Sequence, residues 1–556
     1  MAEQKFKVVV RLQDGSSYIE MLDHPVEAKE LAEKYRKEWE YDFIACRVDR
    51  KTKSLLEVLD HACMLELLDL RDIAAYRIYQ ASLSFLYVRA IQRLYGKRVS
   101  VSFENSLQAG VYTLVKGRGV QAEPSEILAE MRAMVDDDLP FVRSVVSRQE
   151  LMQFFKEKGA KEDLRLFNSA PDIEESLLYT LDGVTEFCFH EMVPSTGWLK
   201  YFDVVRYKGG LLLQHPNVHD PKKIPHREVK KKLYGAYAEN AAWAKIAGIN
   251  CAADLNETVA DGRINETVLL AEALQERKIV EIATEIVEKN KRFVLIAGPS
   301  SSGKTTFAKR LCIQLRVLGK KPLYLGTDDY FVERRDTPVG PDGKNDYETI
   351  EALDLELFNT QMKALMNGEK VDLPEFDFME GTKVFGKRIV TLGQDEPIVI
   401  EGIHGLNPKM TAEIDEENKY RIYISPLTQL NIDAHNRIST NDARLLRRIV
   451  RDHQFRGYSA ARTIEAWPKV RTGEEKNIFP YTDQTDVFFN SHLLYELCIL
   501  KSAAAPLLTE IAEDDPSYPE AQRLLDFLKF FRSLDDFGLV PNHSIMREFI
   551  GGSTIL

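Results

Sequence analysis

Cysteine is scarce in this sequence and shows no pairing pattern. Among 556 residues there are six cysteines, at positions 46, 63, 188, 251, 312 and 498, and there is no C-x-x-C motif. Disulfide frameworks and zinc ribbons require closely or regularly spaced cysteines, so we expect reduced thiols. Long apolar runs are also lacking: no stretch of 18 apolar residues, as a membrane span would need, occurs. Residues 1–7 lack the apolar segment of a signal peptide. These features predict a cytoplasmic protein with no membrane partner.

Basic residues are in deficit. The 74 Lys and Arg are outnumbered by 86 Asp and Glu, which gives a formal charge of −12. This balance disfavours non-specific nucleic-acid binding over the whole surface, although a local basic patch and tRNA binding stay open. The hydrophobic content of 44% is that of globular domains, and the length exceeds one ordinary core. We therefore expect two to four folded domains.

A phosphate-binding loop is the clearest motif present. The apolar residues 293–297 predict a buried strand, residues 307–312 begin a helical pattern, and residues 298–305 between them read G-x-x-x-x-G-K-[ST]. Loop N–H groups and the helix N-terminus bind phosphate oxygens. Lys304 would reach the outer phosphates and the Thr305 hydroxyl would hold Mg²⁺. We predict a nucleoside triphosphate site formed by Gly298, Ser300, Ser301, Ser302, Gly303, Lys304, Thr305 and Thr306.

Two further strands end in acidic residues. The run 321–326 is followed by Asp328, and the run 398–400 is followed by Glu401. Open α/β sheets bind ligands at the carboxyl ends of their strands. A carboxylate there can accept the proton of an attacking hydroxyl or hold Mg²⁺ through water. With a third apolar run at 420–424, the repeated strand–helix units predict a parallel, doubly wound sheet.

One segment concentrates arginine on a helical face. Arg444, Arg447, Arg448 and Arg451 recur every three or four residues without acids between them. A solvated basic face and an RNA-binding patch are the simpler interpretations. The functional interpretation is a lid that closes over the triphosphate and adds positive charge to the transferring phosphoryl group.

Five motifs in this order resemble the uridine kinase / phosphoribulokinase family. They are the phosphate-binding loop, T-D-D-Y-F at 327–331, P-E-F-D-F at 374–378, I-V-I-E-G-I at 398–403 and R-L-L-R-R-I-V-R-D at 444–452. The resemblance covers roughly 200 residues. It implies an ATP- or GTP-dependent, Mg²⁺-requiring kinase that phosphorylates the 5′-hydroxyl of a nucleoside.

The resemblance also implies roles for individual residues. Asp328 corresponds to the base that activates the 5′-hydroxyl, and Thr305 and Glu401 correspond to the Mg²⁺ ligands. Lys304 and Arg447 complete the expected catalytic groups. Arg444 matches a family residue that contacts the ribose. Arg447, Arg451 and Arg456 match residues of the lid that contacts the phosphates.

On the acceptor side, the resemblance is less complete. Asp346 or Glu348 matches the acid that binds the ribose diol, and the spacing leaves both open. Phe331 and Phe376 would line the base pocket. Uridine–cytidine kinases carry a Tyr and, five residues later, a His that read the pyrimidine, where this chain has Phe376 and Gly381. Since hydrogen-bonding groups are what reject a wrong base, the preferred nucleoside stays open.

The N-terminal half resembles the front of threonyl-tRNA synthetases. Residues 1–65 read strand, Asp-Gly turn, strand and helix, with that helix opened by Pro25 and Val26, and resemble the β-grasp-like TGS domain. Residues 66–235 resemble the α+β editing domain in the segments 90–95, 99–103, 138–143 and 192–197.

The metal-type site of that editing domain is not reproduced. Its two helical histidines fall at Ala81 and Phe85, its Cys at Cys188, and its last His at Met192, with His190 two residues away. Without those imidazoles we expect editing to be lost. A scaffold, a dimer contact or a regulatory site are the roles left to this domain.

The domain order expected from these features is TGS-like (1–65), editing-like (66–235), a helical connector (236–290), the kinase domain (291–490) and a helical C-terminal extension (491–556). In the connector we expect a polar link between residues 256 and 266, and a core-facing stripe that includes Leu269, Ala273 and Ile279. The apolar tail after residue 540 is expected to pack back on the protein.

We interpret the chain as a nucleoside kinase that forms a homo-oligomer and has a nucleoside as its small-molecule partner. Two other functions are compatible with the sequence. The family resemblance also covers phosphoribulokinase- and pantothenate-kinase-like enzymes. A switch that binds tRNA or the ribosome and senses a nucleoside triphosphate would instead use the N-terminal half for RNA.

Overall fold

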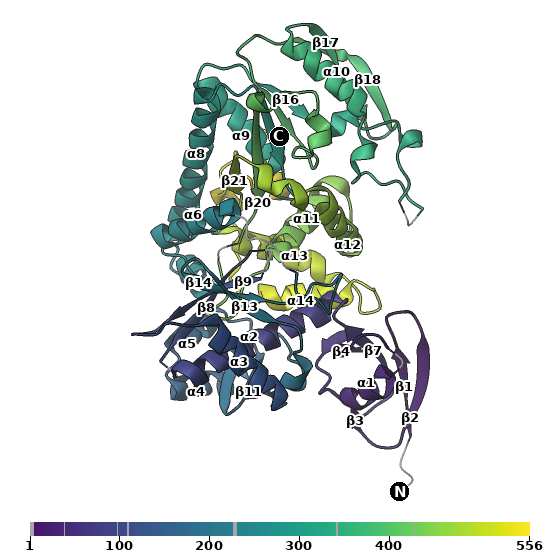
Figure 1. Ribbon diagram of the computed structural model, residues 1–556, viewed down its shortest axis with the longest axis vertical. Helices are drawn as coiled ribbons and strands as arrows, with labels where there is room; N and C mark the ends of the chain where they lie inside the picture. The colour runs from purple at the N-terminus through teal and green to yellow at the C-terminus, as the bar shows by residue number, and fades with distance from the viewer. Residues whose placement is uncertain are drawn as a thin grey trace.

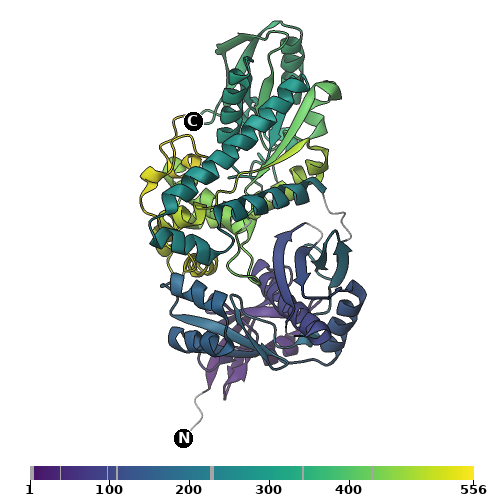
Figure 2. The ribbon, with the colours of Figure 1, turned by 90° about the vertical axis from the view of Figure 1, so that its left-hand side faces the viewer.

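The protein is an assembly of three sheet-containing parts. The computed structural model describes residues 5–37, 39–96, 98–107, 110–225, 231–340, 343–428 and 430–556. The N-terminal parts occupy the lower half of Figure 1, the kinase-like sheet lies in the upper half, and the yellow C-terminal helices lie between them (Figures 1 and 2). Among the residues described, no helix has the length and apolar character needed to cross a membrane.

The first part is β-grasp-like, as predicted. Gly15 adopts φ +89° in the turn of the first hairpin. The expected helix start at Pro25 is wrong, because Val26 and Glu27 pair with β6 and the helix begins only at Ala28. The sheet order is β2-β1-β7-β4-β5, and the elements are β1 (Phe6–Arg11), β2 (Ser17–Leu22), β3 (Val26–Glu27), α1 (Ala28–Arg36), β4 (Phe43–Val48), β5 (Lys51–Lys53), β6 (Val58–Leu59) and β7 (Cys63–Asp69).

The second part is an α+β body with the long helix α2 (Ile73–Tyr95) in its core. Its apolar face includes Leu83, Leu86 and Ile91, which are fully buried. Two antiparallel sheets, β13-β14-β9-β8 and β10-β11-β12, accompany it. The other elements are β8 (Ser100–Ser106), β9 (Val111–Lys116), α3 (Pro124–Asp136), β10 (Val142–Ser147), α4 (Arg148–Lys158), α5 (Lys161–Ser169), β11 (Glu175–Leu181), β12 (Val184–Cys188), β13 (Asp203–Tyr207) and β14 (Gly210–Gln214).

The connector consists of three helices, α6 (Lys231–Ala247), α7 (Ala252–Ala260) and α8 (Ile264–Glu288). The expected polar link is wrong at both ends. Asn256 lies within α7, is fully buried and donates to the Phe530 carbonyl at 2.8 Å, and residues 264–266 already belong to α8. The core-facing stripe of α8 is also partly wrong. Leu269 is 55% exposed and Ala273 is exposed, whereas Ile279 is buried as expected.

The third part is a five-stranded parallel sheet in the order β16-β19-β15-β20-β21. Its central strand β15 precedes the phosphate-binding loop, so the loop lies at the carboxyl edge where the strand order reverses. The predicted doubly wound α/β fold is confirmed. The elements are β15 (Phe293–Ala297), α9 (Lys304–Val317), β16 (Leu323–Gly326), α10 (Leu355–Met366), the hairpin β17 (Lys370–Asp377) and β18 (Thr382–Thr391), β19 (Ile398–Glu401), β20 (Lys419–Ser425), α11 (Thr440–Arg456), α12 (Ala460–Asn477) and β21 (Val487–Asn490).

The C-terminal extension covers the kinase-like part on its lower side. It contains α13 (Glu496–Thr509), α14 (Tyr518–Leu528) and the short α15 (Arg547–Ile550). The expectation that the tail packs back is confirmed, since Ile545, Met546 and Phe549 are fully buried. In Figures 1 and 2 the C-terminus lies beside the upper half of the molecule.

Candidate active site

The phosphate-binding loop is shaped by two glycines that have no room for a side chain. A Cβ atom on Gly298 would overlap the carbonyl oxygen of Ile424 on β20. Gly303 takes φ +84° as the N-cap of α9, and Ser301 takes φ +60°. This curled backbone turns loop N–H groups inward, as phosphate binding requires.

Lys304 and Thr305 follow the loop on the first turn of α9. The Lys304 ammonium donates to the carbonyl oxygens of Gly298 at 3.0 Å and Pro299 at 3.2 Å. The Thr305 hydroxyl donates to the Glu401 carboxylate at 2.9 Å, and the Tyr324 hydroxyl donates to the same oxygen at 3.1 Å. The structure thus brings the two expected Mg²⁺ ligands together.

Asp328 lies beside these groups, in the turn that follows β16. The turns after β16 and β19 are in contact, since a Cβ atom on Gly402 would overlap the Thr327 side chain. The Asp328 side chain is exposed to solvent on one side. The protein atoms around it reduce its contact with water and so raise its pKa, and the positive charges of Lys304 and Arg456 oppose this rise. Burial likewise raises the pKa of Glu401, against the field of Lys304.

The first two arginines of α11 lie under the loop. Arg444 and Arg447 are almost fully buried and form ion pairs with Glu474 of α12 and Glu496 of α13. Arg444 also donates to the Ser300 carbonyl at 3.1 Å, and Arg447 to the Ser491 carbonyl at 2.9 Å. Both guanidiniums therefore donate to acceptors within the protein. Through the carbonyls of Ser300 and Ser301 they hold the loop in place.

The later arginines of α11 surround one buried acid. Asp452 is paired with Arg451 at 2.8 Å, with Arg448 at 3.2 Å and with Arg456 at 3.3 Å. Arg448 also donates to the Ser300 hydroxyl at 2.7 Å. Arg456 is the most exposed of the three, and its field reaches Asp328.

An aromatic cluster is built around Phe331, which lies three residues after Asp328 in the chain. The rings of Phe331 and Phe376 are 5.7 Å apart, and Phe378 and Tyr347 lie against them at 5.1 Å and 5.5 Å. Phe378 is 59% exposed, so the cluster is open at one side. At the position of the absent histidine, Gly381 takes φ +73°, and Arg334 occupies the space where its side chain would project.

The two acids considered for the ribose diol differ in surroundings. Asp346 accepts the Glu348 N–H at 3.1 Å and so holds its own turn. Burial and the nearby Glu474 raise the pKa of Glu348 to about 7, and Arg448 and Lys304 oppose this rise. Glu348 therefore lies close enough to Arg448 and Lys304 to interact with their charges, whereas Asp346 holds the local backbone.

The kinase-like part is similar to known proteins. Residues 293–494 match the model described as the phosphoribulokinase / uridine kinase family. The C-terminal half contains a kinase domain of this family. A solved structure described as a possible uridine kinase from Bacillus stearothermophilus is 21% identical, covers 38% of this chain and 98% of its own, and has a TM-score of 0.26. D-glycerate 3-kinase from Cryptococcus neoformans is 14% identical over 46% of this chain and 87% of its own, with a TM-score of 0.21.

Curated relatives match the N-terminal part. Threonine–tRNA ligase of Halorhodospira halophila is 27% identical over 202 residues, which are 36% of this chain and 31% of the relative. The ligase of Symbiobacterium thermophilum is 29% identical over 170 residues, 30% of this chain and 26% of the relative. The chain thus spans about a third or less of the length of these relatives. The predicted resemblance of both halves is confirmed.

Within the editing-like part, the positions of the expected metal site are occupied by packing residues. Phe85 packs against Phe141 with ring centroids 6.0 Å apart, and Met192 is 3% exposed. Burial raises the pKa of the Cys188 thiol well above its usual value. Burial and the nearby Arg77 lower the pKa of His190 to about 3.

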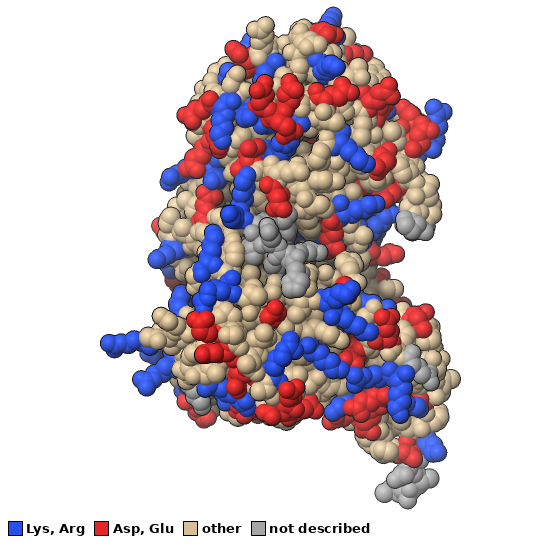
Figure 3. Space-filling model, viewed as in Figure 1, with Lys and Arg blue, Asp and Glu red and all other residues tan. Residues whose placement is uncertain are grey.

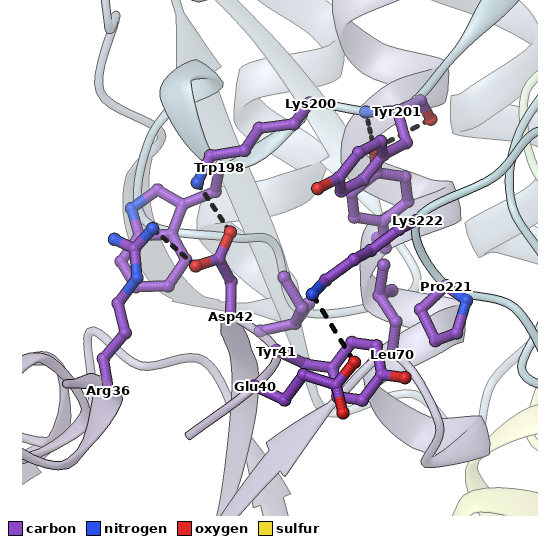
Figure 4. A pocket seen from close by; sticks show the side chains of 12 residues that line it. Arg36, Glu40, Tyr41, Asp42, Leu70, Trp198, Lys200, Tyr201, Pro221 and Lys222 are labelled. Atoms are coloured by element: carbon purple, nitrogen blue, oxygen red, sulfur yellow. Dashed lines mark hydrogen bonds and ion pairs between the residues drawn. The ribbon is translucent and has the colours of Figure 1, made fainter. Parts of the chain in front are cut away.

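A cavity of about 210 Å³ lies where the β-grasp-like and editing-like parts meet (Figure 4). Its charged lining is paired internally: Asp42 binds Lys200 at 2.6 Å and Arg36 at 2.5 Å, and Glu40 lies 3.7 Å from Lys222. The cavity contains no residue of the kinase domain, so it is separate from the phosphate-binding loop. The role of this half stays a prediction.

Three acids of the kinase site were missed or left undecided by the sequence. Glu474 accepts the Ser300 N–H at 3.0 Å in addition to its pairing with Arg444. Glu548, 242 residues away from Thr306, accepts its N–H and hydroxyl. Glu348 could be named only as one of a pair. A buried arginine-rich helix requires acidic partners, but the sequence gives no sign of which ones.

Proposed function

We propose that the protein transfers the γ-phosphate of ATP or GTP to the 5′-hydroxyl of a nucleoside and so forms the 5′-monophosphate. The observation that carries the proposal is the convergence of Lys304, the Thr305–Glu401 pair and Asp328 at one edge of the parallel sheet. Each group in this set has a role in phosphoryl transfer: charge neutralisation, metal binding and proton acceptance.

The oxygen donors of Thr305 and Glu401 fit Mg²⁺. This ion prefers oxygen ligands and is commonly held by one or two protein groups together with substrate phosphates. In the part of the chain that is described, no cluster of three or more His, Cys, Asp or Glu could hold a metal by itself, which agrees with such a shared site. When bound, Mg²⁺ would neutralise phosphate charge.

Asp328 is the group suited to accept the proton of the attacking hydroxyl. Its raised pKa brings it closer to the working range of a general base, and the positive charges of Lys304 and Arg456 favour its ionised form. Lys304 would exchange its two carbonyl contacts for phosphate oxygens. Arg444 and Arg447 act from beneath by fixing the loop backbone.

The acceptor end of the site supports a nucleoside. Flat aromatic faces stack on bases, and Phe331, Phe376, Phe378 and Tyr347 form one cluster of such rings. Glu348 follows Tyr347 of this cluster in the chain, interacts with the charge of Lys304, and is suited to accept hydrogen bonds from ribose hydroxyls. On the face shown in Figure 3, Lys and Arg are interspersed with Asp and Glu, an arrangement that supports a small acceptor more than a nucleic acid.

A substrate screen tests the proposal. Purified full-length protein would be assayed for ADP release with each nucleoside, with ribulose 5-phosphate and with pantothenate, with Mg²⁺ present. We expect release that depends on a nucleoside and on Mg²⁺ and that is lost in Lys304→Ala. Release stimulated only by ribulose 5-phosphate or pantothenate would assign the site to another acceptor of the same family.

A further inference from the structure

The C-terminal segment 544–551 is in direct contact with the phosphate-binding loop. The Glu548 carboxylate accepts the Thr306 hydroxyl at 2.7 Å and the Thr306 N–H at 3.2 Å. Burial raises the pKa of Glu401, and the negative charge of Glu548 adds to this rise. A carboxylate thus lies on the first turn of α9, in the region that a triphosphate has to use.

The segment is held there by buried contacts. Ile545 fills the space beside Gly303, where a Cβ atom would lie 2.5 Å from the isoleucine Cγ2. The Arg447 guanidinium lies over the Phe549 ring, 5.0 Å from its centroid. The hydroxyls of Ser544 and Tyr495 are 3.2 Å apart. These contacts hold Glu548 against Thr306.

The Thr306 N–H belongs to an anion-binding position. It is the third helical N–H after the N-cap Gly303, and the first N–H groups of a helix have no partner within the helix. In phosphate-binding loops the backbone N–H groups surround the α- and β-phosphates, and the lysine reaches the β- and γ-phosphates. A carboxylate and a phosphate are both anions that such a position favours.

A second observation, at Ser301 and Ser302, also points to a ligand at this loop. The hydroxyls of Ser301 and Ser302 are buried, at 3% and 0% residue exposure, and neither oxygen has a hydrogen-bond partner in the described residues. Buried hydroxyls are normally satisfied, so unpaired ones inside a phosphate-binding loop are suited to hydrogen-bond a ligand.

We propose that Glu548 is a donor-site residue that competes with the inner phosphates of the nucleoside triphosphate for Thr306. The C-terminal segment thereby sets the affinity for the donor. The inference rests on the proposed function in one respect, that a triphosphate binds this loop. Two anions cannot share the same two donors, so triphosphate binding requires the Glu548 side chain to leave Thr306.

The test compares binding of Mg²⁺ with a non-hydrolysable ATP analogue and of inorganic pyrophosphate to four full-length proteins by titration calorimetry. These are the wild type, Glu548→Gln, Glu548→Asp and the control Glu510→Gln, which changes an exposed acid at the end of α13. We expect Glu548→Gln to strengthen binding of the ATP analogue about tenfold or more and pyrophosphate binding by less. Glu548→Asp, which retains the charge on a shorter side chain, should give a smaller gain, and Glu510→Gln none.

Other outcomes separate the inference from the proposed function. If Glu548 only caps α9, Glu548→Gln lowers the unfolding temperature and leaves the affinity unchanged, and the inference is overturned. Weaker binding in Glu548→Gln would overturn it too, because the side chain would then be a ligand contact. If no protein of the set binds the analogue, the triphosphate site fails, and both proposals fail with it. Should Glu548→Gln not fold, the gain expected of Glu548→Asp decides the question alone.

Discussion

At the scale of single residues, Asp328 is the group on which transfer should depend most strongly. Replacing it with Asn keeps the size of the side chain and removes its ability to accept a proton. We expect turnover to fall by about 10²–10⁴-fold, the usual contribution of a general base, while the dissociation constant for MgATP changes little. The check is steady-state kinetics together with ATP titration of Asp328→Asn. Transfer at the wild-type rate would remove Asp328 from this role.

Glu348 should give the reaction a pH dependence near neutrality. Its pKa is raised to about 7, so the side chain is ionised above this pH and gains a proton as the pH falls through it. A neutral carboxyl is a weaker acceptor for ribose hydroxyls, so kcat/KM for the nucleoside should fall below about pH 7. In Glu348→Gln this limb should disappear and kcat/KM should be low throughout. An unchanged profile in the variant would show that another group titrates.

The sequence predicted the loop and the carboxylates well for a physical reason. A strand, a glycine-rich turn and a helix leave little freedom in where Lys304 and Thr305 lie, and strand ends in a parallel sheet meet at one edge. Asp328 and Glu401 were therefore placed correctly near the loop. Glu474 and Glu548 were not found, because their role depends on chain folding over 174 and 242 residues of separation from Ser300 and Thr306.

At the scale of elements, α11 supports the loop through buried charge. The sequence showed that its arginines share a face, but periodicity cannot tell whether that face meets solvent or protein. The structure shows Arg444 and Arg447 beneath the loop, each with a buried glutamate. The arginines nearer the end of α11 pair with Asp452, and their role in a lid stays a prediction.

The Arg447–Glu496 pair provides a test of this support. Both side chains are fully buried, so removing one partner leaves an uncompensated charge, with a loss of about 3–5 kcal/mol of stability expected. We expect Arg447→Met and Glu496→Gln each to lower the denaturation midpoint strongly. The double variant Arg447→Met with Glu496→Leu should recover part of the loss. Denaturation followed by tryptophan fluorescence measures this. A double variant less stable than both single ones would contradict the account.

At the scale of the whole molecule, the N-terminal half is joined to α11 by a charged junction that resemblance to known families could not reveal. Arg523 of α14 binds Asp442, in the first turn of α11, at 2.8 and 2.9 Å, and also binds Glu520. Arg77 of α2 binds Glu520 at 2.9 Å and lies 3.5 Å from Asp442. In Figure 1, α14 lies between α2 and α11. A residue of the editing-like part thus contacts the helix that holds the phosphate-binding loop.

This junction predicts that Arg77 acts on the kinase as a positioning residue. In Arg77→Met, Asp442 and Glu520 lose one cation, so the first turn of α11 should be held less firmly. We expect KM for the triphosphate to rise about 3–10-fold, a coupling of the order of 1 kcal/mol, with kcat little changed. Arg77→Lys should restore part of the effect, and Arg93→Met, which removes an α2 arginine paired with Asp182 at 2.7 Å, should leave KM unchanged.

Combining Arg77→Met with Asp442→Asn tests whether Arg77 influences triphosphate binding through Asp442 or only stabilises the contact between the two halves. If Arg77 acts through Asp442, the double variant should raise KM by less than the product of the two single effects, because the second change removes an interaction already lost. If the junction only holds the halves together, both changes lower the unfolding temperature and leave KM at the wild-type value. That result would mean that the N-terminal half stabilises the kinase domain but does not affect its binding of the triphosphate.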